Sequence, residues 1–174
     1  MVNLFQRRKS FRGPPPPQAP SYANSGGSGD RSALITLTQA ANLNSQPGMV
    51  SPSIMINGVN NAGTAYFNTH PVYMYDGWWL MFDFGTPKLI DEFKWYQQNS
   101  STHGTWKFQG SLDNSTWVDI GTSFTLGGST TQTVTEISSN ILGYRYYRLY
   151  LVTGPSSTSP YLYEIEFKIA NYTY

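Results

Sequence analysis

The side chains that most often carry catalysis are scarce in this sequence. It holds two histidines, His70 and His103, ten carboxylates and no cysteine. It has no Gly-x-Ser-x-Gly nucleophile elbow, no phosphate-binding loop and no His-x-x-x-His zinc pair. Glu164 and Glu166 fall on the same face of an expected strand, whereas a glycosidase pair must face each other across a sugar. The inventory therefore predicts a protein that binds a ligand and is not an enzyme.

Amide, imidazole and aromatic side chains gather in three polar segments, residues 66–78, 96–105 and 154–161. Proteins hold sugars with an aromatic ring under the C–H face and with amides or charged groups on the hydroxyls. Trp79 is expected in the core, so its neighbour Trp78 should present an exposed ring on the other side of the strand. The candidate sugar contacts are Trp78, Gln97, Gln98, His103 and Tyr161.

Short runs of alternating apolar and polar residues predict the elements that position these loops. Leu80, Phe82 and Phe84 alternate with less apolar residues, and residues 92–96 and 145–151 show the same period of two. Turns with Gly, Pro and Asn separate the runs. No long window has the 3.6-residue period of a helix. Many short strands without intervening helices predict an all-β antiparallel sandwich or barrel.

The order of these runs along the chain is similar to that in a known protein family. The quoted segments are Trp79-Leu80-Met81-Phe82-Asp83-Phe84-Gly85, Trp106-Lys107-Phe108-Gln109-Gly110-Ser111, Asp113-Asn114-Ser115-Thr116-Trp117, Arg145-Tyr146-Tyr147-Arg148-Leu149 and Leu162-Tyr163-Glu164-Ile165-Glu166-Phe167. Over roughly residues 34–169 they resemble the discoidin, or coagulation-factor C-type, domain, a group that includes sugar-binding modules of bacterial glycosidases.

The resemblance implies a discoidin-like (galactose-binding-like) jelly-roll β-sandwich of about eight antiparallel strands, with the candidate contact loops gathered at one end. Its members bind ligands and rarely do chemistry. Relatives often place an arginine in these loops, but no arginine lies between Arg31 and Arg145 here, which leaves the ligand class open.

The resemblance also implies a structural calcium site, although no cofactor is required for the expected function. Its ligands would come from the Ile56-Asn57-Gly58-Val59-Asn60 loop, from Thr64 and from Glu164 near the last strand. Calcium takes six to eight oxygens with some carboxylate charge, and Asn57 stands where relatives usually have aspartate. In the alternative, Asn57 and Glu164 hydrogen-bond the loop directly and hold it closed.

Residues 1–30 have a different composition from the rest and are expected to form an extended docking arm and linker, with the sandwich over residues 31–174. Pro14 to Pro17 favour a stiff polyproline II segment, and Ser25 to Gly29 a flexible joint. We expect residues 1–20 to dock on a partner through apolar and basic side chains. These are Leu4, Phe5, Arg7, Arg8, Phe11 and Arg12.

Charge and cysteine content indicate which partners and which cellular compartment to expect. Residues 1–12 hold four of the eleven basic side chains and no acidic one, so the rest has seven basic against ten acidic groups. This balance argues against specific nucleic-acid binding, and no apolar run is long enough for membrane insertion. Animal discoidin domains usually carry a disulfide, so the absence of cysteine favours a bacterial or viral relative made in a reducing cytoplasm. The N-terminus has no apolar run of a secretion signal.

Together these features predict a non-enzymatic adhesion or carbohydrate-binding module displayed on a larger assembly. A phage virion component such as a tail, baseplate or capsid-fibre protein fits best, made in the host cytoplasm and present in many copies. Its partners would be other virion proteins, reached through the arm, and a cell-surface glycan, reached through the loops. The alternative is a structural decoration or joining protein that binds no glycan.

Overall fold

The described part of the chain is all β apart from one short 3-10 helix. The computed structural model describes residues 18–40, 52–60, 76–97, 99, 103–134, 142–154 and 162–171. In chain order the elements are β1 (Thr36–Gln39), η1 (Pro52–Ile56), β2 (Trp79–Gln97), β3 (Thr105–Ser111), β4 (Val118–Thr125), β5 (Thr131–Val134), β6 (Tyr144–Thr153) and β7 (Leu162–Asn171). No helix in these residues has the length and apolarity to span a bilayer.

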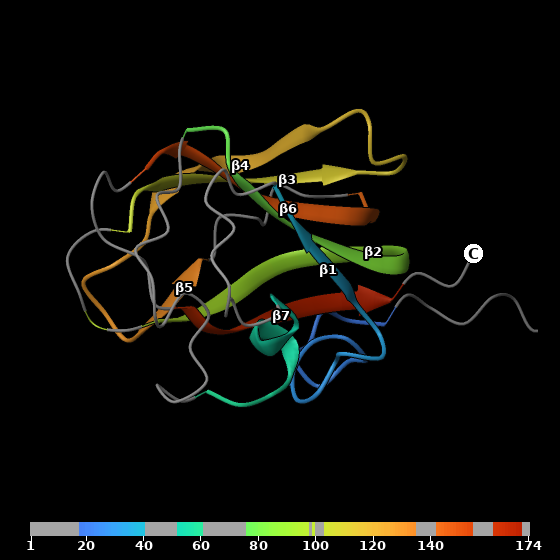
Figure 1. The fold of residues 1–174 in the computed structure, drawn as a ribbon. Coiled ribbons are helices and arrows are strands. Elements are labelled where there is room, and N and C mark those ends of the chain that lie inside the picture. The colour runs from blue at the N-terminus through green and yellow to red at the C-terminus, as the bar shows by residue number, and fades with distance from the viewer. Residues whose placement is uncertain are drawn as a thin grey trace, which may run out of the picture.

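Strand β2 belongs to both layers of a sandwich, as Figure 1 shows. Its first part pairs with β1 and β6, and β6 continues through β3 to the edge strand β4. Its second part pairs with β7 and the short β5. All pairs are antiparallel, and this arrangement confirms the predicted jelly-roll sandwich. The described residues contain seven of the roughly eight strands expected.

Gly85-Thr86-Pro87 has the composition of one of the expected turns, but in the structure it forms a kink inside β2. The pairing with β6 shifts register between Asp83 and Lys88, and Gly85 has a φ of 71°. A glycine tolerates this left-handed backbone, and Pro87 lacks the N–H of a regular ladder. The kink redirects one continuous strand from the first layer into the second, so both layers share a backbone element.

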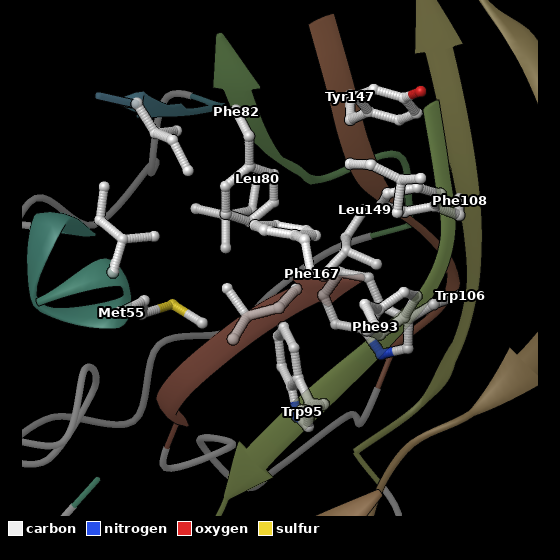
Figure 2. Packing of buried hydrophobic residues seen from close by; sticks show 14 of the residues in the cluster. Met55, Leu80, Phe82, Phe93, Trp95, Trp106, Phe108, Tyr147, Leu149 and Phe167 are labelled. Carbon is white, nitrogen blue, oxygen red and sulfur yellow. The ribbon is translucent and has the colours of Figure 1, made fainter. Parts of the chain in front are cut away.

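Aromatic side chains from the two layers meet in the core (Figure 2). Phe82 lies 5.0 Å from Phe167 and Phe93 lies 5.2 Å from Phe108, measured between ring centroids. Both pairs join residues of opposite layers. Offset or edge-on ring pairs of this kind are worth about 0.5–1.5 kcal/mol beyond the burial of their area. Met55 closes the core from η1 and is fully buried.

Residues 18–31 pack against β7, which corrects the expected boundary at residue 30 (Figure 1). Ser21 and Ile169 exchange two backbone hydrogen bonds, of 2.8 and 3.2 Å, and the Phe167 N–H donates to Gly27 O at 2.8 Å. A Cβ on Gly27 would lie 2.4 Å from Tyr22 O. The Ser25–Gly29 segment is therefore no flexible joint. Gly27 permits the close contact between backbones.

Candidate functional site

The end of the sandwich where β2 finishes and β3 begins holds a set of uncharged polar side chains, all of them buried except the partly exposed Gln132. We call Trp95, Gln97, His103, Trp106 and Gln132 the neutral cluster. Gln97 and His103 have no exposed surface, and neither have the two tryptophans. The alternation of Phe93 and Trp95 along β2 points its next odd-numbered residue, Gln97, into the core as well.

Gln97 is the centre of the neutral cluster. Its Oε1 accepts hydrogen bonds from Trp95 Nε1 at 2.8 Å and from His103 Nδ1 at 2.9 Å. Its Nε2 donates to Ser129 O at 2.7 Å and to Gln132 Oε1 at 2.9 Å. All four hydrogen-bonding positions of the amide are used, as burial of such a group requires.

This geometry assigns the protonation state of His103. Because Gln97 Oε1 can only accept, the hydrogen must lie on His103 Nδ1. Burial lowers the pKa of His103 to about 4, so the ring is neutral at pH 7. A neutral imidazole suits a cluster that has no carboxylate to balance a charge.

The neutral cluster fixes the ends of several loops. His103 N donates to Leu126 O at 2.6 Å, and Gln97 N donates to Thr130 O at 3.0 Å. Trp106 Nε1 donates to His103 O at 2.9 Å. These bonds place the start of β3 beside the 126–130 connection. Loops that begin from such a rigid base can hold a ligand with little ordering of the base itself.

A second wall of the same end comes from the 76–78 segment. The indole of Trp78 lies 6.1 Å from that of Trp106, edge to face, and Leu151 N donates to Trp78 O at 2.8 Å. Gly154 N donates to Asp76 Oδ1 at 2.9 Å. This bond joins the described ends of two of the polar segments, at Asp76 and Gly154.

The structure buries three of the five predicted sugar contacts. Trp78 is only 5% exposed and Trp79 is the more exposed neighbour, so the predicted orientation of this pair was wrong. Trp78 has the same parity as Leu80 and Phe82, which point inward. Gln97 and His103 are likewise buried, so these side chains position loops and do not present themselves to a ligand. Gln98 and Tyr161 lie outside the described residues.

A groove of about 540 Å³ opens beside the neutral cluster, between β4 and β5. Its described lining residues are uncharged and are contributed by β3, β4 and β5. They are Thr105, Phe108, Ile120, Thr122, Ser123, Phe124, Thr125, Gln132, Thr133 and Val134. Phe124 is half-buried, and Thr133 is exposed. Gln132 belongs to both groove and cluster, since its Oε1 accepts from Gln97.

The groove combines an aromatic ring with hydroxyl and amide groups, which is the chemistry of a site for a neutral sugar. The groove was not predicted from the sequence, because its residues come from three strands with ordinary alternation. The Ser/Thr-rich, charge-free run of residues 121–134 was the available signal.

Two of the three residues predicted to hold calcium, Asn57 and Glu164, have protein partners in the structure. Glu164 is 2% exposed and forms an ion pair with the buried Arg31, and its Oε2 accepts from Gly58 N at 3.2 Å. Asn57 Oδ1 accepts from Val59 N at 2.8 Å. Among the described residues, no group of three or more His, Cys, Asp or Glu could hold a metal. Thr64 lies outside the described residues, as do the arm residues Leu4, Phe5, Arg7, Arg8, Phe11 and Arg12.

The sequence relationships agree with this architecture. A family model for the F5/8 type C domain matches residues 37–165, and the chain belongs to that family. This confirms the resemblance to the discoidin domain. No sequence among the curated proteins is a match to the chain.

Solved structures with low sequence identity share the fold. CpGH89CBM32-5 from Clostridium perfringens, in complex with GalNAc-β-1,3-galactose, is 12% identical with a TM-score of 0.56, covering 78% of this chain and 96% of that one. Chitosan-binding module 2 from Paenibacillus sp. IK-5, in complex with chitotriose, is 17% identical with a TM-score of 0.56, covering 77% and 95%. An F5/8 type C domain from Bacteroides fragilis is 14% identical with a TM-score of 0.58, covering 82% and 95%. The fold is thus that of a carbohydrate-binding module.

Proposed function

We propose that this chain is a non-enzymatic carbohydrate-binding module that attaches a larger assembly to glycans on a cell surface. The observation that carries the proposal is the uncharged groove between β4 and β5, which has a half-buried ring among hydroxyl and amide groups. The sugar complexes of the modules from Clostridium perfringens and Paenibacillus support it.

The lining of the groove favours a neutral sugar. Phe124 offers a ring for the apolar C–H face, while Ser123 and Thr133 offer hydroxyls for the equatorial groups. No charged side chain is among the described lining residues, and these offer no cation to a uronic or sialic acid. The part of the lining that the structure describes holds no carboxylate and thus no acid–base pair for hydrolysis.

Binding through one shallow groove is weak, on the order of a millimolar dissociation constant, or about −4 kcal/mol. Display in many copies would raise the effective affinity by roughly a hundredfold or more. We infer that residues 1–20 supply this display by docking on other proteins of the assembly. Leu4, Phe5 and Phe11 would be the apolar anchors, and the neighbouring arginines would meet acidic surface. A phage virion is the assembly that the composition of the arm and the cysteine-free body favour.

A glycan array with single variants tests the groove. Phe124→Ala should weaken binding about tenfold or more, because it removes the ring under the sugar. Thr133→Val should weaken it less, because it keeps the shape and removes one hydroxyl. Val118→Ala is the matched control, since Val118 is exposed on the same strand outside the groove.

The same array separates the groove from the loop tips. If Gln98→Ala and Tyr161→Ala abolish binding while Phe124→Ala leaves it intact, the site lies in the loops and the groove assignment is wrong. If the folded chain binds no glycan at all, the alternative of a structural joining protein stands.

Deletion of residues 1–17 tests the arm without disturbing residues 18–31, which pack on β7. We expect the shortened chain to keep its unfolding temperature and its glycan binding and to lose incorporation into particles. Incorporation at the level of the full chain would contradict the docking role.

A further inference from the structure

Arg31 is the most deeply buried cation of the described residues, with no exposed surface. It follows the glycine-rich segment 25–29 and precedes β1. Its guanidinium donates from Nε to Gly29 O at 2.9 Å and from Nη1 to Gly27 O at 3.0 Å, and Nη2 meets Glu164 Oε1. We call Arg31, Glu164 and the glycines 27, 29 and 58 the charged cluster.

The oxygens that surround Arg31 are of the kinds that calcium takes in proteins. One carboxylate and two backbone carbonyls converge on a single positive group. Both oxygens of Glu164 are used, because Oε2 accepts from Gly58 N. The charge of Glu164 is already balanced by Arg31, and a divalent ion placed beside the guanidinium would be repelled.

Two glycines let the backbones come close enough for this arrangement. A Cβ on Gly27 would lie 2.4 Å from Tyr22 O and 2.8 Å from Phe167 O. Gly58 has a φ of 77°, and a Cβ there would lie 2.6 Å from Gly29 C. Such contacts exclude any larger residue unless the backbone moves. The glycines therefore build the cradle that brings three chain segments to one cation.

Arg31 also joins these segments through its own backbone. Its N–H donates to Ile56 O at 2.8 Å, and its carbonyl accepts from Ile35 N at 2.9 Å. Side chain and main chain together connect the 27–31 segment, the end of η1 and β7. Burial lowers the pKa of Arg31 to about 10, so the guanidinium stays charged at neutral pH.

We infer that Arg31 is a built-in cation that takes the place of the calcium ion implied by the family resemblance. The module then needs no metal to hold the 27–31 segment and the 56–58 loop on β7. Its fold is stable in calcium-free surroundings and in chelators.

Thermal unfolding of the full chain tests this directly. We expect the same Tm in excess EDTA and in millimolar calcium, and no calcium retained by the purified protein in metal analysis. A Tm that rises with calcium, or a stoichiometric amount of retained calcium, would overturn the inference.

Variants test whether the cation itself is needed. Arg31→Ala should lower the Tm by about 10 °C, because removing one partner of a buried pair leaves the other charge uncompensated. Arg145→Ala is the matched control, since Arg145 pairs with Asp83 but its side chain is 42% exposed. We expect the control to lower the Tm by about 3 °C at most. Equal losses in the two variants would overturn the inference.

A double variant separates charge pairing from packing. Arg31→Leu with Glu164→Leu should have a higher Tm than Arg31→Leu alone, because no unpaired charge is left in the core. A double variant less stable than the single would count against a cation role. If Arg31→Leu does not fold, Arg31→Lys is measured in its place. A Tm for Arg31→Lys above that of Arg31→Ala supports the inference, because a cation is kept at this position. A Tm no higher than that of Arg31→Ala overturns it.

Discussion

Two buried polar clusters hold this sandwich together, and they solve the same problem with different chemistry. The neutral cluster around Gln97 joins loop ends through an amide, an imidazole and two indoles. The charged cluster around Arg31 joins three segments through a guanidinium and a carboxylate. In each cluster the central side chain hydrogen-bonds to neighbouring groups, because a buried polar group without a partner costs free energy.

The two clusters differ because the groups around each central side chain differ in whether they donate or accept hydrogen bonds. Backbone carbonyls of Gly27 and Gly29 converge in the charged cluster, and only a group rich in donors can serve them together with Glu164. In the neutral cluster donors and acceptors alternate, so an amide that does both is sufficient. The charged cluster should therefore be the more sensitive to loss of one side chain, and the neutral cluster the more sensitive to pH.

The largest expected effect is at the charged cluster. Glu164→Gln keeps the shape of the side chain and removes its charge, which leaves the buried guanidinium of Arg31 unbalanced. We expect the free energy of unfolding to fall by about 3–5 kcal/mol. Urea denaturation of the variant and of the unaltered chain measures the difference. If the free energy of unfolding falls by less than is usual for an exposed ion pair, the charged cluster is held by packing alone.

Acid is expected to lower the free energy of unfolding through the neutral cluster, by slightly less than Glu164→Gln does. The pKa of His103 is about 4 in the folded protein and near 6.5 when unfolded, because burial disfavours the charged ring. The stability is thus fully present above pH 6.5, and it is lost as pH falls from 6.5 to 4, where the unfolded chain binds a proton that the folded chain rejects. The difference corresponds to about 3 kcal/mol.

Denaturant unfolding at a series of pH values checks this expectation. His103→Asn keeps a donor near the position of Nδ1 and removes the titration, so its stability should change less over this range. His70→Gln is the control, since it removes the other histidine of the chain. If His103→Asn shows the same pH dependence as the unaltered chain, His103 does not carry the effect.

A smaller effect compares two glycines of the charged cluster. Gly27→Ala should cost about 2–3 kcal/mol, because its Cβ would meet backbone oxygens that no side-chain rotation can move. Gly29 has a φ of 72° with open space around it, so Gly29→Ala should cost only about 1 kcal/mol, from its backbone conformation. Urea denaturation of both variants gives the comparison. Equal costs would show that close approach is not what requires Gly27.

The fold was largely predictable because alternation along a strand is a local property. Leu80, Phe82 and Phe84 were expected inward and are buried. The same parity, carried two residues back from Leu80, places Trp78 inward. Beyond the kink, the alternation of Phe93 and Trp95, carried two residues forward, places Gln97 inward. The prediction for Trp78 and Gln97 relied instead on residue type, because sugar sites need an exposed ring and polar contacts. Parity was therefore the better guide to the site than residue type.

The charged cluster was not predictable from the sequence for a different reason. Ser25 to Gly29 has the composition of a flexible linker, and composition alone does not distinguish flexibility from close packing. The meeting of Arg31 with Glu164 depends on a contact between residues 133 positions apart. Pairings of this range emerge only when the layers of the sandwich are assembled.

The smallest expected effect extends the comparison to the surface. Lys107 and Asp119 form an ion pair at 2.6 Å with side chains that are 39% and 46% exposed. Water screens both charges and competes for their hydrogen bonds, so Lys107→Ala should change the free energy of unfolding by about 0.5 kcal/mol or less. Urea denaturation in low and high salt measures this value. A loss as large as that of Glu164→Gln would contradict the view that burial, rather than charge pairing itself, sets the importance of the charged cluster.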